Sequence, residues 1–196
     1  MSEKGVCKNV SFVNQQVLDL LTQATSMGCD AAEIDITMES GFSVSVRKGS
    51  LDLLEQQNEQ GLSLTVFKER CAASVSTTDF TEKSLQAVLL KAMSLVSFTQ
   101  PDEFKGLADR SCLAFDYPDL QLNHPRSVTP DEAIVLAMEM DARVCEEDSR
   151  ILHCESAEVS TSLVNCLYAN THGFVGHYPY SVYQMSCGVL AEDQTG

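Results

Sequence analysis

The chain has 196 residues, of which 44% are hydrophobic and 21% charged, so it is long enough for one large domain or two small ones. Its 28 acidic and 13 basic residues give a formal net charge of -15, which repels phosphate backbones and anionic lipid headgroups. This charge excludes nucleic acid and a membrane surface as expected partners. A solvated surface that aids solubility explains it better than a dedicated cation site does.

The first ten residues, MSEKGVCKNV, lack the apolar segment of a signal peptide. The apolar runs elsewhere, such as Ala87–Leu90, are much shorter than a membrane span. We therefore expect a cytoplasmic protein. The eight cysteines include no CxxC pair, so neither a zinc knuckle nor a redox pair is indicated. In a reducing compartment most of them are expected to be small buried hydrophobic residues.

Apolar residues at helical spacing predict a first amphipathic helix over residues 14–27, with Ser11 or Asn14 as its N-cap and Gly28 just after its end. Five short segments in which apolar and polar residues alternate follow between residues 31 and 78. They are separated by glycines and by a charged turn. Because these connections are too short for crossovers, we expect a five-stranded, mostly antiparallel meander.

A second helix is expected to begin after the N-cap residue Thr81, with its apolar residues on one face. Together with the first helix it would cover the apolar face of the meander, which makes residues 1–99 an α+β domain. The proline-containing stretch 100–127 has no regular period and is read as a connection that packs along the surface.

Residues 128–196 predict a second, smaller α+β domain. Thr129, Pro130 and Glu132 form a capping box with proline at the first helical position. The helix is expected to run to about Glu146 and to bury four of its apolar side chains, those of Ile134, Ala137, Met138 and Val144. About three strands follow, at 151–159, 163–169 and 180–191, with turn residues at 170–173.

Few residues suggest chemistry. Zinc would need several of the histidines and cysteines of the second half to converge; these are His153, Cys154, Cys166, His172, His177 and Cys187. Satisfied loop histidines and core cysteines explain them more simply. The acidic pairs Glu33/Asp35 and Asp131/Glu132 are better explained as a solvated strand face and a helix N-terminus than as acid/base pairs. The strand 71–78 would either accept an extended peptide by main-chain pairing or pair within its own sheet.

Motifs along nearly the whole chain resemble the TldD/PmbA peptidase family, in the family's order and with features of its PmbA/TldE branch. They are GFSVSVRKGSLDLLEQQNEQGLSLTVF, ASVSTTDFT, PDEFKGLAD, LAFDYPDLQLNHP with VTPDEAI, and YANTHGFVGHYPYSVYQMSCGVLAED. The resemblance implies an N-terminal portion of a longer protein, with an incomplete central domain at 128–196 and without the family's C-terminal domain. In the TldD-like subunits, that C-terminal part holds an HExxxH zinc motif.

The resemblance further implies a non-catalytic subunit of a heterodimeric metallopeptidase complex that cleaves unfolded or extended peptides, as in leader-peptide removal and antitoxin degradation. Zinc is expected on the TldD-like partner, and no catalytic, cofactor-binding or metal-binding residue is assigned to positions 1–196. A homodimer is a further possibility. The alternative is a stand-alone acidic interaction module that binds an extended segment on a sheet edge.

Overall fold

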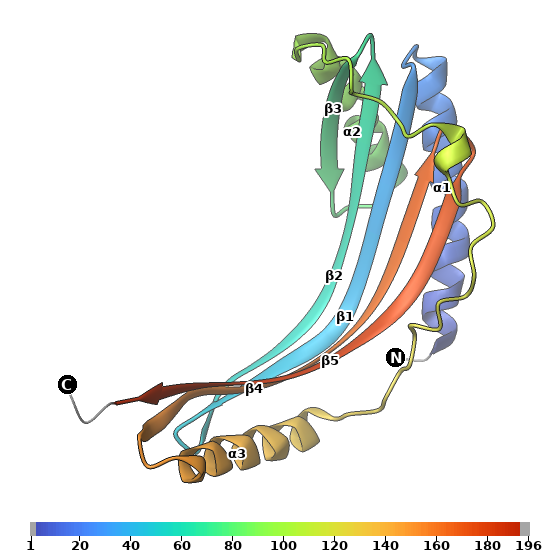
Figure 1. The fold of residues 1–196 in the computed structure, drawn as a ribbon. Coiled ribbons are helices and arrows are strands. Elements are labelled where there is room, and N and C mark those ends of the chain that lie inside the picture. The colour runs from blue at the N-terminus through green and yellow to red at the C-terminus, as the bar shows by residue number, and fades with distance from the viewer. Residues whose placement is uncertain (1–2, 193–196) are drawn as a thin grey trace. The chain divides into compact units, whose positions relative to one another are not determined.

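The computed structural model describes residues 3–192 and contains one five-stranded antiparallel sheet with helices (Figure 1). The predicted α+β class and an antiparallel sheet of five strands are confirmed, although residues 31–77 supply three of these strands and residues 151–191 the other two. The strands lie in the order β3-β2-β1-β4-β5. In chain order the elements are α1 (Glu3–Ser26), β1 (Ala31–Arg47), β2 (Ser50–Lys68), β3 (Cys71–Thr77), α2 (Glu82–Leu95), the 3-10 turns η1 (Val96–Phe98) and η2 (Arg110–Cys112), α3 (Pro130–Glu147), β4 (Ile151–Asn170) and β5 (Val175–Ala191).

The strands are fewer and longer than the sequence suggested. Residues 31–78 form three strands instead of five, and residues 151–191 form two instead of three. Gly41 lies inside β1, where a Cβ would come within 2.0 Å of the carbonyl oxygen of Thr161, so this glycine permits a close approach of two strands and marks no turn. Gly49 does form a turn, because Lys48 and Gly49 have φ values of 51° and 71°.

Two compact units make up the chain, and each takes residues from several stretches of sequence. Unit 1 comprises residues 1–38, 60–120 and 165–178; unit 2 comprises 39–59, 121–164 and 179–196. Each unit therefore combines stretches that lie far apart in the sequence. The physical reason is that β1, β2, β4 and β5 are long enough to contribute residues to both units.

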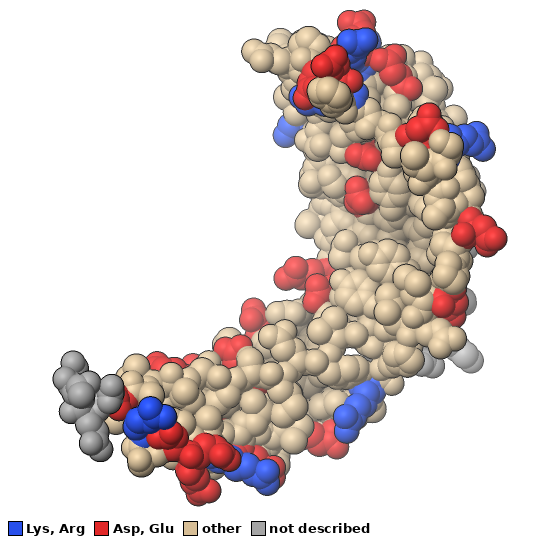
Figure 2. Space-filling view, viewed as in Figure 1, with Lys and Arg blue, Asp and Glu red and all other residues tan. Residues whose placement is uncertain are grey.

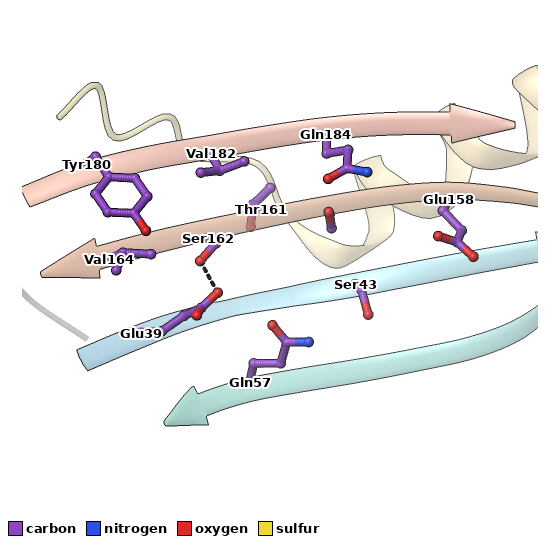
Figure 3. A pocket seen from close by; sticks show the side chains of 11 residues that line it. Glu39, Ser43, Gln57, Glu158, Thr161, Ser162, Val164, Tyr180, Val182 and Gln184 are labelled. Carbon is purple, nitrogen blue, oxygen red and sulfur yellow. Dashed lines mark hydrogen bonds between the residues drawn. The ribbon is translucent and has the colours of Figure 1, made fainter. Parts of the chain in front are cut away.

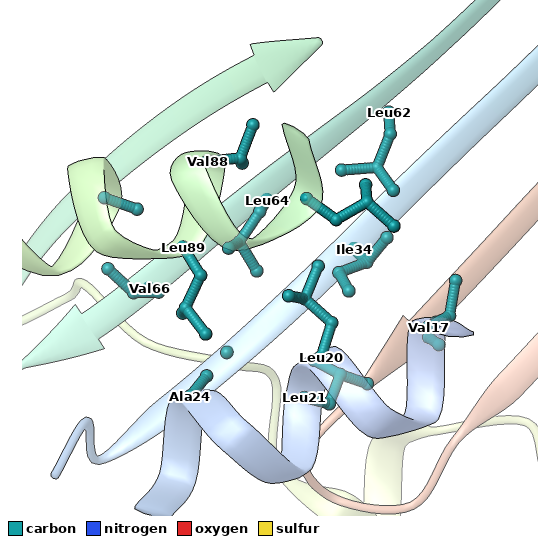
Figure 4. Packing of buried hydrophobic residues seen from close by; sticks show 14 of the residues in the cluster. Val17, Leu20, Leu21, Ala24, Ile34, Leu62, Leu64, Val66, Val88 and Leu89 are labelled. Carbon is teal, nitrogen blue, oxygen red and sulfur yellow. The ribbon is translucent and has the colours of Figure 1, made fainter. Parts of the chain in front are cut away.

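The core of unit 1 lies between its part of the sheet and the helices α1 and α2 (Figure 4). α1 presents Val17, Leu20, Leu21 and Ala24, and α2 presents Leu85, Val88, Leu89 and Ala92, to alternate residues of β1 and β2. Thr81 caps α2 as predicted, accepting a hydrogen bond from the Ser84 amide. The predicted start of the first helix was wrong, since α1 already includes Ser11 and Asn14; Gly28 does follow its end, with φ of 86°.

The core of unit 2 lies between α3 and the strands. Val44, Val46 and Val159 pack against Ala133 and Ala137 of α3. The predicted capping box is present: Thr129 accepts from the Glu132 amide, and the Glu132 carboxylate accepts from the Thr129 amide at 2.8 Å. The predicted burial of Met138 was wrong, because Met138 is 38% exposed, whereas Asp141 of the same helix is only 6% exposed.

Residues 100–127 contain no strand and only the short turn η2. Part of the stretch lies against β5: in unit 1 the His177 amide donates to the Tyr117 hydroxyl at 3.1 Å, and in unit 2 the Ser181 amide donates to the Leu122 carbonyl at 3.1 Å. Phe104, by contrast, is 88% exposed. The expected surface packing therefore holds for the second part of this stretch and fails for Phe104.

Candidate functional site

Each unit has a polar sheet face opposite its helices, and alternation along β1 creates both faces. In unit 1, Ile34 and Ile36 enter the core, so Glu33 and Asp35 point to the other side. In unit 2, Val44 and Val46 pack toward α3, which places Ser43 on the face away from that helix. The alternation along β1 thus contributes apolar residues to the cores of both units and polar residues to the opposite face of each.

The polar face of unit 2 carries a hollow of about 330 Å³, which we call the polar hollow (Figure 3). Four strands line it. Its polar side chains include those of Glu39 and Ser43 of β1, Gln57 of β2, Glu158 and Ser162 of β4, and Gln184 of β5. Ser162 donates a hydrogen bond from Oγ to Glu39 Oε1 at 2.5 Å, which fixes both side chains on the floor (Figure 3).

Chemically, the polar hollow suits an extended polar segment. Hydroxyl and amide side chains can both donate and accept hydrogen bonds, and the backbone of an extended peptide offers unpaired N–H and C=O groups. The carboxylates of Glu39 and Glu158 add negative charge, which favours amines or basic side chains in a bound segment.

On the polar face of unit 1, the Tyr168 hydroxyl donates to Glu33 Oε2 at 2.8 Å and accepts from Nδ2 of the Asn170 side chain at 3.2 Å. Burial raises the pKa of Tyr168 to about 12, and Glu33 adds to the shift. Burial and, to a lesser extent, the Glu33 carboxylate raise the pKa of Asp35. The hydrogen bond from Tyr168 to Glu33 joins β4 to β1, so Glu33 has a protein partner and does not simply lie on the solvated strand face expected from the sequence.

The Asn170–Gly173 turn predicted between the last two strands is present. The Asn170 carboxamide oxygen accepts from the amides of His172 and Phe174 at 3.0 and 3.3 Å, and Gly173 has φ of 83°. Burial lowers the pKa of the nearby His177. The turn thus positions His172 through its own hydrogen bonds, whereas His177 lies in β5, where its amide donates to the Tyr117 hydroxyl.

The six histidines and cysteines considered for zinc are divided between the units: Cys166, His172 and His177 belong to unit 1, and His153, Cys154 and Cys187 to unit 2. His153 pairs with Glu155, and the Cys154 and Cys187 sulfurs lie 3.0 Å apart. Within residues 3–192, no group of three or more His, Cys, Asp or Glu side chains is arranged to hold a metal ion.

β3 lies at one edge of the sheet. It pairs antiparallel with β2, from Cys71 opposite Lys68 to Thr77 opposite Leu62, and in the described part of the chain no other strand pairs with it. The strand is therefore paired within its own sheet, as one of the two interpretations expected, and acceptance of an extended peptide on its outer side stays a prediction.

The distribution of charged side chains can be followed on one face of the molecule (Figure 2). On the face drawn in Figure 2, Asp and Glu are spread over the helices and strands with Lys and Arg among them. This distribution agrees with a solvated surface rather than a dedicated cation site. No helix among the described residues is both long and apolar enough to cross a membrane.

Sequence reasoning missed the polar hollow. Its residues carried a usable signal, because polar side chains at every second position of β1 and the run Ser160-Thr161-Ser162 mark a polar face. The pattern could not show that β2 and β5 add Gln57 and Gln184 to the same place, since this depends on the strand order.

Two family models match the chain. The PmbA/TldA metallopeptidase domain 1 matches residues 32–96, and the PmbA/TldA metallopeptidase central domain matches residues 123–196. Among sequences, the metalloprotease PmbA of Escherichia coli O157:H7 is 31% identical over 91% of this chain and 40% of its own length. A PmbA homolog of Haemophilus influenzae is 32% identical over 91% of this chain and 39% of its own length.

Solved structures show the same fold. A Bacteroides thetaiotaomicron protein whose description links it to DNA gyrase superposes with a TM-score of 0.81 at 24% identity, over 92% of this chain and 41% of that one. TldE from Thermococcus kodakarensis gives a TM-score of 0.74 at 12% sequence identity, and the match covers 92% of this chain and 40% of that one. The chain spans about two fifths of the length of the curated relatives it matches. On the strength of both domain models, the chain belongs to the PmbA/TldA metallopeptidase family, the TldD/PmbA family that its motifs resemble.

Proposed function

We propose that this chain is the N-terminal part of a non-catalytic, PmbA/TldE-like subunit of a cytoplasmic metallopeptidase complex. In this proposal it supplies a wall of the peptide chamber and a surface for a TldD-like partner. Family membership supports the peptidase context. The polar hollow supports the role of a wall, because its hydroxyl, amide and carboxylate groups can hold an extended peptide without cutting it.

The proposed division of labour rests on the resemblance of the motifs to PmbA/TldE-like subunits. Residues 1–196 contain no HExxxH sequence, so none of the zinc-binding residues of the family can be assigned to a position here. Zinc and the bond-breaking step belong to the TldD-like subunit in this proposal, and the substrates are unfolded or extended peptides such as leader peptides and antitoxins. The single observation that carries the role of this chain is the polar hollow, which faces away from α3.

The test combines the full-length protein with its cognate TldD-like protein. We expect the two to co-purify and together to cleave an extended peptide. Within that complex, Gln57→Ala removes one hydrogen-bonding group from the hollow and should raise KM about fivefold with little change in kcat, since one hydrogen bond contributes about 1 kcal/mol.

Gln56→Ala is the matched control, because Gln56 is exposed and points to the opposite side of β2 from Gln57. Its kinetics should match those of the wild type. Equal effects of the two substitutions would exclude the hollow as a peptide surface. A full-length protein that neither pairs with the TldD-like subunit nor supports cleavage would refute the whole proposal.

The second candidate is a stand-alone interaction module that binds an extended segment on β3, and the edge position of this strand favours it. Here the chain alone, without a TldD-like subunit, would bind extended peptides. Ser74→Pro would then abolish the binding if the amide of Ser74 pairs with the peptide. Peptide binding that appears only with the TldD-like subunit would favour the first proposal.

A further inference from the structure

We propose that Cys154 and Cys187 form a peroxide-responsive thiol pair that closes to a disulfide between β4 and β5. Their sulfur atoms lie 3.0 Å apart in unit 2. The two strands therefore do not need to rearrange for the disulfide to form. Cys154 is the fourth residue of β4 and Cys187 lies near the end of β5. The inference is independent of the peptidase role proposed above.

The two thiols differ in access. Cys187 is exposed, whereas Cys154 is only 1% exposed. An oxidant in solution can therefore reach Cys187 and cannot reach Cys154 directly. This asymmetry assigns the roles: Cys187 is the thiol that is oxidised, and Cys154 is the resolving thiol held next to it.

The surroundings of Cys154 keep it protonated until that step. Burial raises the pKa of Cys154 to about 12, with further contributions from Cys187 and from the Asp141 carboxylate. Asp141 is itself buried and accepts a hydrogen bond from the Gly49 amide at 2.7 Å, so its position is fixed by the β1–β2 turn. A protonated thiol is a poor target for oxidation and also a weak nucleophile, so the attack of Cys154 requires its proton to pass to the departing hydroxyl group as the S–S bond forms.

The chemistry balances with hydrogen peroxide as the oxidant. The Cys187 thiolate attacks one peroxide oxygen, the O–O bond breaks, and Cys187 sulfenic acid and hydroxide form. The Cys154 sulfur then attacks the sulfenic sulfur, the S–O bond breaks, and the thiol proton of Cys154 leaves with the hydroxyl group as water. Both sulfurs are oxidised by one electron each, and the peroxide is reduced to water and hydroxide, the latter taking up the proton that Cys187 released on ionising.

The bond would link two strands whose connecting chain runs from residue 154 to residue 187. Closing such a loop restricts the unfolded chain more than the folded one. Oxidation would therefore fasten the end of the β4–β5 hairpin in unit 2 and stabilise it reversibly, since thiols can reduce the disulfide again.

The experiment treats the full-length protein with hydrogen peroxide, alkylates the remaining thiols, and maps disulfides by mass spectrometry. We expect a Cys154–Cys187 cross-link that dithiothreitol reverses, together with a rise of roughly 5–10 °C in the melting temperature of the oxidised protein. The exposed Cys145 of α3 provides the matched control, because Cys145→Ser should leave the cross-link and the melting shift unchanged.

Cys187→Ser should abolish the cross-link and the melting shift while leaving Cys154 a free thiol. This variant alters an exposed side chain, so it should fold, and circular dichroism of the reduced protein checks that it does. The proposal is overturned if Cys187 proceeds to sulfinic or sulfonic acid while Cys154 remains free for alkylation after unfolding. It is equally overturned if Cys187 cross-links to other cysteines as readily as to Cys154.

Discussion

Leu89→Ala tests whether the core of unit 1 holds this part of the protein together. Leu89 lies in α2 and is 0% exposed. It belongs to the apolar core of unit 1, together with residues of α1, β1 and β2. Truncation of a leucine at such a position removes buried apolar surface and leaves a cavity, which costs about 3 kcal/mol. With a urea m-value of about 2 kcal/mol per molar, the unfolding midpoint should fall by about 1.5 M.

The assay is urea unfolding followed by far-ultraviolet circular dichroism, and the adjacent residue provides the control. Leu90 of the same helix is 58% exposed, so Leu90→Ala should change the free energy of unfolding by no more than about 0.5 kcal/mol. The reasoning would be refuted by equal losses in the two variants, because α2 would then not bury the face described here.

Three further outcomes follow from local geometry. Gly41→Ala should destabilise the protein by about 1–3 kcal/mol in urea unfolding, because the added Cβ would meet backbone atoms. Gly61→Ala is the control: its Cβ would meet nothing within 4 Å, so it should destabilise the protein by no more than about 0.5 kcal/mol. Equal losses of stability in the two variants would contradict the close approach of the strands at Gly41. A hydrogen bond from Arg150 lowers the pKa of Asp148 from 3.8 to about 2, so its stabilising contribution is present above the ordinary pKa and is lost as the pH falls through about 2. Arg150→Ala should return the pKa of Asp148 toward 3.8 in an NMR titration. An unchanged pKa would show that the Arg150 side chain does not cause the lowered pKa. Thr129→Ala should lower the melting temperature, since loss of an N-cap costs about 1 kcal/mol, and an unchanged value would show that the cap does not stabilise α3.

Sequence patterns predicted what depends on neighbours in the chain. The caps at Thr81 and Thr129 were recognisable because a capping residue and its partner lie within three positions. The alternation around Ile34 and Val44 gave the buried face of β1 for the same reason.

What the patterns could not give depends on residues far apart in sequence. A glycine between two alternating segments predicts a turn at Gly41, and only the approach of Thr161 shows that the missing side chain permits strand packing. Helical spacing predicted burial for Met138 and gave no reason to bury Asp141, whose carboxylate finds the Gly49 amide 92 positions away. The polar hollow depends in the same way on which strands become neighbours.

Because β1 lies between β2 and β4, its two neighbouring strands become available at different times during translation. β2 follows β1 at once, but β4 begins only at Ile151, roughly a hundred residues after β1 ends. At about 5–20 residues per second, about 5–20 s pass between the synthesis of the end of β1 and that of the start of β4, and the second edge of β1 has no partner during that time. During that interval a nascent chain presents an unpaired strand edge with apolar residues beside it, a template for wrong pairing. We therefore expect the growing chain to be most vulnerable to aggregation, and most dependent on chaperones, between the synthesis of β3 and that of β4.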